Sequence, residues 1–180
     1  MNLPRVIPVL LLRGRGVYKT VRFKDPTYVG DPLNTVRLFN EKEANEIVVL
    51  DIAATREGRG PDFEFLEDMA SECFMPFAYG GGITTVDQIR HLFFLGAEKA
   101  VLNAAIFDQP RLIEDAARQF GSQSIVASID VKKKILGGYE VCTHNANNGR
   151  GRKPADVAKE VESRGAGEIL INAVDRDGTL

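Results

Sequence analysis

The stretch YGGGITTVDQIRHLFFLGAEKAVLNAA, residues 79–105, contains a strand, a glycine turn, a helix and a second strand in immediate succession. Within 84–95, Thr84 or Thr85 can cap a helix whose apolar residues recur at helical spacing. The segment 99–105 that follows is a short apolar run with little polar alternation, which is typical of a strand covered on both faces. The stretch therefore predicts one β–α–β unit of a parallel sheet.

The same alternation extends in both directions along the chain. Further strand-like runs occupy 5–12, 46–52, 75–81, 124–131 and 168–174, and helix-like segments occupy 32–45, 62–73, 109–120 and 154–164. Asp108 is expected to cap the helix of 109–120, with Pro110 in its first turn. The stretch KKKILGGYEVCT, residues 132–143, predicts a hairpin at Gly137-Gly138.

Repeated β–α units allow either a doubly wound sheet or a (β/α)₈ barrel. No GxGxxG motif follows the first strand, which weakens the dinucleotide-binding alternative. Residues 44–49, ANEIVV, resemble residues 166–171, AGEILI, and VIPVLLL at 6–12 can be set against IVASIDV at 125–131. Two matches in order suggest duplicated half-barrels, with chance likeness between apolar strands as the alternative. The family resemblance given below favours duplication, and with it we predict one barrel domain, with a first half at about 1–121 and a partial second half at about 122–180.

Composition narrows the classes of function. The 180 residues include 23 basic and 25 acidic side chains, a net charge of −2, which argues against nucleic-acid binding by bulk electrostatics. No run of 18 apolar residues occurs, so no membrane span is expected. The apolar run of 6–12 lacks a basic flank and a cleavage site, and Cys73 and Cys142 fit no metal-ligand spacing. We expect a cytoplasmic protein with reduced thiols.

Two glycine and asparagine motifs suggest phosphate binding. Gly80, Gly81 and Gly82 end one expected strand, and Asn103-Ala104 ends the next. Consecutive glycines let backbone N–H groups approach an anion beside a helix N-terminus. A lone triple glycine is more often a tight turn, but its placement beside Asn103-Ala104 favours a phosphate cradle.

Acidic residues follow the ends of several expected strands, where barrel active sites form. They are Asp51, Asp130, and Asp175 or Asp177. For Asp51, a substrate contact and a turn cap are equally good interpretations, whereas Asp130, at the end of an apolar strand, favours acid–base work. Lys19 follows the first strand in a glycine-rich loop, residues 13–19, which could close over an anionic substrate, although an exposed loop lysine is the simpler alternative.

Four charged residues open the strands at the opposite end. Arg5, Glu46, Lys99 and Glu168 are expected to form a ring at the barrel floor, where a stabilising role is usual. His91 and His144 have no metal-ligand partner nearby in the sequence, and we expect neither a metal nor another cofactor.

Several of these segments together resemble one family. VVLDI at 48–52, the stretch 79–105, FGSQSIVASID at 120–130, GGYEVCTH at 137–144 and GAGEILINAVDRDGT at 165–179 are similar to the cyclase subunit of imidazole glycerol phosphate synthase. The likeness covers 5–180. It implies a (β/α)₈ barrel with a glutaminase partner at its floor, which sends ammonia to a phosphorylated substrate at the top for cyclase and lyase chemistry.

The resemblance also implies roles for single residues. The ring of Arg5, Glu46, Lys99 and Glu168 becomes an ammonia gate, and Asp130 and Lys19 become the catalytic pair. The expected binding site for the phosphorylated substrate combines residues that the resemblance implies with others that follow strand ends. They are Gly81, Gly82, Asn103, Ala104, Asp51, Asn172, Asp177 and Gly178.

Three departures from the family pattern affect the expected function. Leu11 stands where the family has an aspartate on strand one, so the histidine-pathway cyclisation should be severely impaired. Asn172 and Ala78 replace expected threonines. Strands seven and eight are absent, so we expect a truncated barrel that would be unstable or associate through its open edges.

An intact gate without the strand-one carboxylate suggests a paralogue that supplies ammonia for an acetamidino sugar of surface polysaccharides. VLLL at 9–12, RFKDP at 22–26 and YVGDP at 28–32 resemble that branch. The alternatives are an ammonia-using enzyme subunit, a non-catalytic ammonia conduit, and a sister sugar-phosphate isomerase, against which Leu11 also counts.

Overall fold

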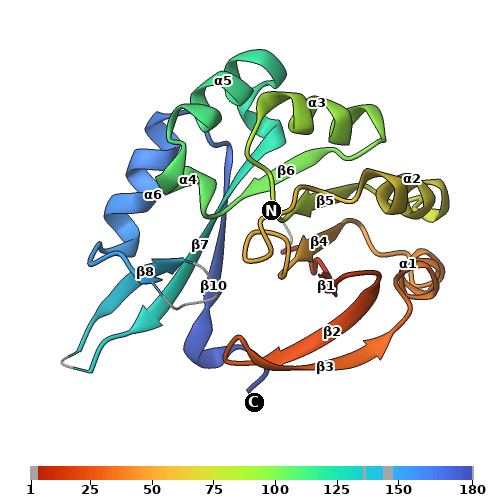
Figure 1. The fold of residues 1–180 in the computed structure, drawn as a ribbon, viewed down its shortest axis with the longest axis horizontal. Helices are drawn as coiled ribbons and strands as arrows, with labels where there is room; N and C mark the ends of the chain where they lie inside the picture. The colour runs from red at the N-terminus through yellow and green to blue at the C-terminus, as the bar shows by residue number, and fades with distance from the viewer. Residues whose placement is uncertain (1–3, 136, 144–147, 180) are drawn as a thin grey trace.

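A computed structural model describes residues 4–135, 137–143 and 148–179, and its centre is a curved sheet of parallel strands (Figure 1). The parallel strands are β1 (Val9–Arg13), β4 (Ile47–Asp51), β5 (Phe77–Gly80), β6 (Lys99–Leu102), β7 (Ile125–Lys133) and β10 (Glu168–Ala173), and they neighbour one another in that order. Within the described residues β1 and β10 do not pair, so the barrel wall is open there. The predicted α/β fold with parallel strands is confirmed.

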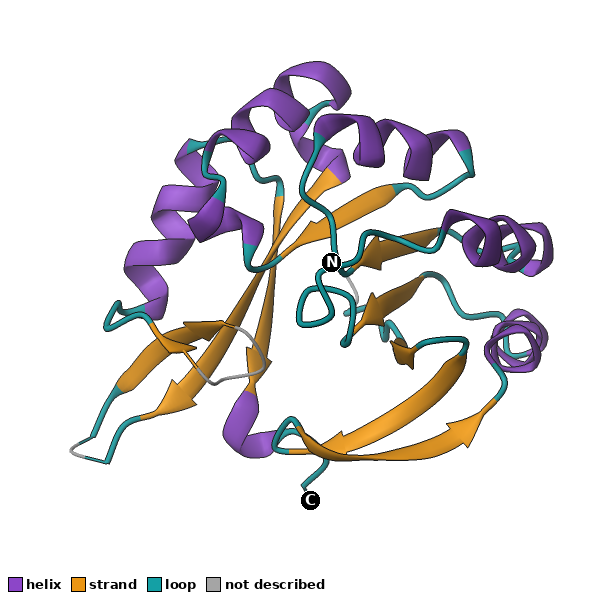
Figure 2. Ribbon diagram, in the orientation of Figure 1, coloured by secondary structure: helices purple, strands orange, loops and turns teal. Residues whose placement is uncertain are grey.

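Helices cover the convex face of this sheet (Figure 2). They are α1 (Pro32–Glu41), α2 (Phe63–Glu72), α3 (Val86–Phe94), α4 (Ala105–Asp108), α5 (Arg111–Phe120) and α6 (Pro154–Ser163). The predicted cap of the fifth helix is wrong, because Asp108 ends the short α4 and Pro110 precedes α5 without a side-chain cap. In the described ranges, every helix is too short or too polar to cross a bilayer.

Two apolar layers explain why the strands read as apolar runs. The larger lies between the sheet and the helices and includes Ile47, Met69, Ile89 and Ile113. A smaller layer fills the concave side, where Val48, Ala78, Val101 and Val126 meet from four neighbouring strands. Because successive strand side chains point to opposite faces, each of the four central strands, β4 to β7, contributes to both layers.

Two antiparallel hairpins extend the parallel strands. β2 (Gly16–Val21) and β3 (Lys24–Gly30) follow β1, with Tyr18 and Tyr28 in edge-to-face contact across them. The interpretation of 13–19 as a glycine-rich loop is therefore wrong over most of its length, because strand pairing with β1 orders the backbone from Gly16 onward.

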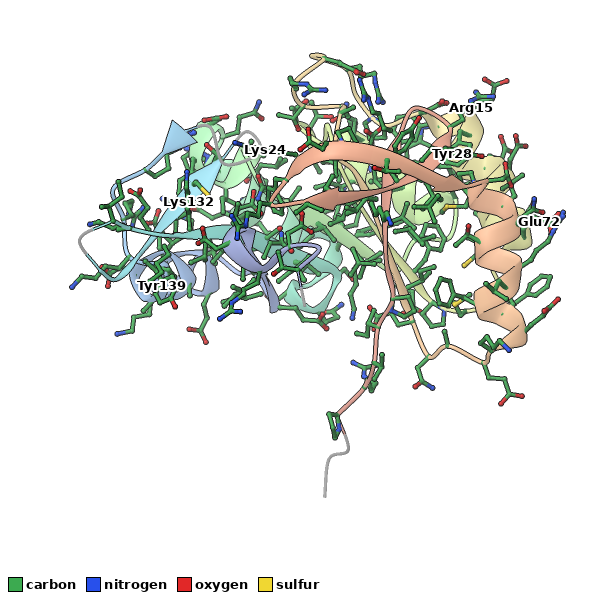
Figure 3. All side chains as sticks on the ribbon, turned by 90° about the horizontal axis from the view of Figure 1, so that it is seen from below. Arg15, Lys24, Tyr28, Glu72, Lys132 and Tyr139 are labelled. Atoms are coloured by element: carbon green, nitrogen blue, oxygen red, sulfur yellow. The ribbon has the colours of Figure 1, made fainter. Side chains whose placement is uncertain are left out.

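The second hairpin is the predicted one. β8 (Tyr139–Thr143) pairs with β7, with Asp130 opposite Cys142, and the short β9 (Asn148–Gly149) pairs with β8. Figure 3 places Lys24, at the turn of the first hairpin, between Tyr28 farther along it and Lys132 on the second. Single turns of 3₁₀ helix, η1 (Ser122–Ser124) and η2 (Val174–Arg176), complete the described chain.

A capping box fixes the start of α3 just after the triple glycine. The hydroxyl of Thr85 accepts from the Gln88 backbone N–H at 3.2 Å, and the Gln88 side chain accepts from the Thr85 N–H at 3.1 Å. Thr85→Ala should lower the free energy of unfolding by about 1 kcal/mol, measured by urea denaturation. Thr27→Ala on the exposed β3 is the control, and an equal loss in both variants would contradict this role.

Candidate functional site

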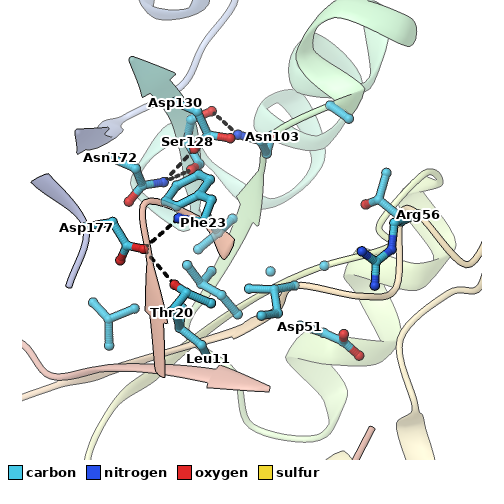
Figure 4. Close-up of a pocket in the computed structure, with 18 residues that line it drawn as sticks. Leu11, Thr20, Phe23, Asp51, Arg56, Asn103, Ser128, Asp130, Asn172 and Asp177 are labelled. Carbon is cyan, nitrogen blue, oxygen red and sulfur yellow. Dashed lines mark hydrogen bonds between the residues drawn. The ribbon is translucent and has the colours of Figure 1, made fainter. Parts of the chain in front are cut away.

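A cavity of about 330 Å³ lies at the carboxyl ends of the parallel strands (Figure 4). Side chains and backbone from β1, β2, β4, β5, β6, β7 and β10 line it, together with the loop after β4 and the turn after β10. Because parallel strands end at the same edge of the sheet, residues distant in sequence meet there. The cavity therefore contains most of the predicted site.

Asp130 is the most deeply buried carboxylate of this cavity, with 5% of its surface exposed. The Asn172 amide donates to its Oδ1 at 2.8 Å and to the Ser128 hydroxyl at 3.1 Å, and the Asn103 amide donates to the Ser128 carbonyl at 3.0 Å. Burial raises the pKa of Asp130, and the amides of Asn172 and Asn103 oppose that rise. Asp130 can therefore hold a proton to higher pH than an ordinary aspartate and act as an acid.

Apolar side chains line much of the rest of the cavity. Leu11, Val9 and Leu50 line the cavity from β1 and β4, and Phe23 reaches it from the turn between β2 and β3. Figure 4 shows the Phe23 ring beside Ser128 and Asn172. Leu11 faces the cavity where the resemblance places a second acid–base group, and a leucine supplies no titratable proton.

The other two cavity carboxylates bind the chain itself. Asp51 Oδ1 accepts from the Ala53 and Ala54 backbone at 2.9 and 3.0 Å, and its Oδ2 pairs with Arg59 at 2.7 Å. Asp177 Oδ2 accepts from Thr20 and from the Phe23 backbone. For Asp51 these contacts favour the turn-capping interpretation, although the residue also borders the cavity.

Some of the glycines and neighbouring residues expected to bind phosphate line the cavity, whereas others pack against the backbone beside it. Gly81 and Ala104 line the cavity. Gly82, with φ of 68°, does not, and a Cβ there would lie 2.3 Å from the Arg59 carbonyl oxygen. Gly178 likewise lies outside the lining, and its Cβ would be 2.1 Å from the Thr20 oxygen. Gly82 and Gly178 thus allow close backbone approach in this structure.

Lys19 lies apart from the cavity lining. It pairs with Thr27 in the β2–β3 hairpin and is exposed, whereas its neighbour Thr20 faces the cavity. The cation that does line the cavity is Arg56, on the loop after β4, with its guanidinium across the cavity from Asp130 (Figure 4). The structure therefore separates the expected pair of Lys19 and Asp130.

Sequence reasoning missed Thr20, Phe23, Arg56 and Ser128. Ser128 could have been found, because it lies two positions before Asp130 on one strand and so shares its face. The positions of Phe23 and Arg56 depend on loop paths for which the sequence carries no comparable signal.

The floor charges form one cluster at the opposite ends of the strands. Lys99 Nζ lies 2.8 Å from both Glu46 and Glu168, and Arg5 lies 3.6 Å from Glu46. Burial alone would lower the pKa of Lys99, but hydrogen bonds to Glu168 and Glu46 outweigh it and raise the pKa. The structure thus brings the four expected gate residues together.

His91, the histidine that the structure describes, lies in an aromatic stack. His91, on α3, stacks on Phe63 with ring centroids 4.1 Å apart, and His144 lies outside the described residues. Across the described ranges, no group of three or more His, Cys, Asp or Glu side chains is placed to hold a metal ion.

Comparison with known proteins identifies close relatives. The family described as histidine biosynthesis protein matches residues 5–180. Proteins of Leptospira borgpetersenii and Pseudomonas aeruginosa, provisionally named imidazole glycerol phosphate synthase subunits HisF and hisF2, are each 48% identical, over 98% and 97% of this chain and 70% and 69% of their own lengths. Imidazole glycerol phosphate synthase subunit HisF of Nitratidesulfovibrio vulgaris is 42% identical over 97% of this chain and 70% of its own.

Proposed function

The chain belongs to the histidine biosynthesis protein family, with HisF-type cyclase subunits as its relatives, and on this premise we propose that it uses ammonia from a partner glutaminase on a phosphorylated substrate. The partner would dock at the floor, around Arg5, Glu46, Lys99 and Glu168. The substrate would bind in the cavity around Asp130.

The observation that carries this proposal is the arrangement of two polar clusters on the same strands. β10 carries Glu168 in the floor cluster and Asn172 in the cavity, and β6 begins with Lys99 and leads into Asn103. Between the clusters lies the small apolar layer around Ala78. A neutral ammonia molecule admitted at the floor would cross this layer to the cavity, whereas a hydrated ion would be disfavoured there.

In the cavity, the proposed chemistry assigns proton transfer to Asp130. Its raised pKa suits donation to a leaving group, while the Asn172 amide fixes the orientation of its carboxyl group. The substrate phosphate would bind the backbone at Gly81 and Ala104, with Arg56 as the nearby cation.

Leu11 supports a second candidate function. Because it offers no second acid–base group, the chain would catalyse the histidine-pathway cyclisation poorly and would instead supply ammonia, as an enzyme subunit or as a conduit, for amidination of a surface-polysaccharide sugar. The relative named hisF2 is compatible with a copy that serves another pathway, although its name specifies none.

Ammonia-driven turnover of the histidine-pathway substrate tests both candidates. Leu11→Asp should raise that turnover by about tenfold or more, since one positioned acid–base group contributes roughly 10²–10⁴-fold. Leu11→Asn is the matched control, with similar size and no titratable proton. Fast turnover by the native chain would refute the predicted impairment of the cyclisation by Leu11. An unchanged turnover in Leu11→Asp would count against the cyclase assignment.

A further inference from the structure

The single turn η2, after β10, lies between the two antiparallel hairpins. Figure 1 shows this blue turn with the orange β2–β3 hairpin on one side and the cyan β7–β8 hairpin on the other. Two aspartates flank its last residue, Arg176, and their carboxylates contact different hairpins. Asp177 contacts the first hairpin and Asp175 the second.

Asp177 makes a dense set of contacts with the β2–β3 hairpin. Its Oδ2 accepts from the Thr20 hydroxyl at 2.7 Å and from the Phe23 N–H at 2.9 Å, and its carbonyl accepts from the Arg22 N–H at 2.9 Å. The following Gly178 lies so close to Thr20 that no side chain fits. Asp177 thus holds Thr20, near the end of β2, together with Arg22 and Phe23 in the turn between β2 and β3.

The β2–β3 turn that Asp177 holds has a backbone conformation that the residues of the turn seldom adopt. Arg22, Phe23 and Asp25 have φ of 53°, 62° and 50°, in the left-handed region that side-chain-bearing residues seldom adopt. Such a conformation persists only where surrounding contacts stabilise it. For Arg22 and Phe23, those contacts are the hydrogen bonds that Asp177 accepts, and they place the Phe23 ring in the cavity wall.

Asp175 makes the equivalent contact on the other side. Its Oδ2 accepts from the Lys133 N–H at 2.5 Å, at the end of β7 where the second hairpin leaves the barrel wall. Asp130, three positions earlier on the same strand, faces the cavity. One short turn therefore contacts both hairpins through separate carboxylates.

We propose that η2 is a clasp in which Asp177 and Asp175 hold the two hairpins independently, and that Asp177 is a positioning residue acting through Phe23 and Thr20. Release of Asp177 would let the β2–β3 turn relax and remove Phe23 from the cavity wall. The inference goes beyond the proposed function and does not rest on it.

Trypsin susceptibility measures the two contacts separately. Asp177→Ala should speed cleavage after Arg22 by about tenfold, as expected for losing hydrogen bonds to a charged acceptor, and leave cleavage after Lys133 and Lys134 unchanged. Asp175→Ala should do the reverse and serves as the matched control. Thr20→Val, which removes one of the two donors to Asp177 Oδ2, should give a smaller increase after Arg22 and keeps the test valid if Asp177→Ala folds poorly.

A fluorescence measurement reports the cavity wall itself. The chain contains no tryptophan, so Phe23→Trp introduces a sole reporter. Adding Asp177→Ala should shift its emission to the red and increase quenching by acrylamide, and Asp177→Glu should restore part of the native signal. Unchanged cleavage and emission in Asp177→Ala, or loosening of both hairpins in either single variant, would overturn the clasp.

Discussion

Asp130→Asn is expected to lower ammonia-dependent turnover by about 10²–10⁴-fold while making the folded chain more stable at neutral pH. Turnover falls because asparagine cannot transfer the proton. Stability rises because burial disfavours the ionised carboxylate, whereas a neutral amide of nearly the same shape still presents an oxygen to Asn172. The two opposite effects at one residue would mark Asp130 as a functional group.

The pH dependence of this stability difference has a defined sign. The pKa of Asp130 is raised in the folded state, so the folded chain binds more protons than the unfolded chain just above the ordinary aspartate value of 3.8. Stability of the native chain therefore falls as pH rises through that window. The advantage of Asp130→Asn in urea denaturation should be largest near neutral pH and should shrink toward 3.8.

Asp51→Asn is the contrasting variant, because it changes a cavity carboxylate that binds the chain itself. Its oxygens accept from Ala53 and Ala54 and pair with Arg59, so its loss should lower stability at neutral pH. A destabilised Asp130→Asn with full turnover would contradict the assignment of Asp130.

Much of the fold was predictable because it depends on local patterns. The parallel strands are continuous apolar runs, and the helix after the triple glycine carries its own capping box at Thr85. The second hairpin is signalled by Gly137-Gly138 between two apolar runs. In each case a short segment contains the features that specify its own structure, whereas the half-barrel division stays a prediction.

The parts that were missed depend on contacts between distant segments. The turn of 22–25 contains no glycine, and two of its left-handed residues, Arg22 and Phe23, are stabilised by Asp177, more than 150 positions later. Lys19 reads as a loop cation, yet pairing with Thr27 directs it away from the cavity, while the fold of the loop after β4 brings Arg56 to the lining. No local pattern encodes either placement.

Lys99→Met is expected to lower the free energy of unfolding by about 3 kcal/mol, since removing Lys99 takes from the buried Glu46 its nearer cation. Glu46 is 4% exposed, and without Lys99 its remaining cation is Arg5 at 3.6 Å. The pKa of Lys99 is raised in the folded state, so the stabilisation is present below the ordinary lysine value of 10.5 and is lost as pH rises through the folded value. Urea denaturation at neutral and alkaline pH measures both effects.

The double variant Lys99→Met/Glu46→Met separates stability from gating. Replacing both partners by apolar groups of similar length should recover most of the lost stability, because no buried charge remains unpaired. If the cluster controls ammonia passage, the double variant should fold well yet fail to couple glutamine hydrolysis by a partner glutaminase to turnover in the cavity. Normal coupling in this stable variant would leave the cluster with a structural role alone, as the floor of the barrel.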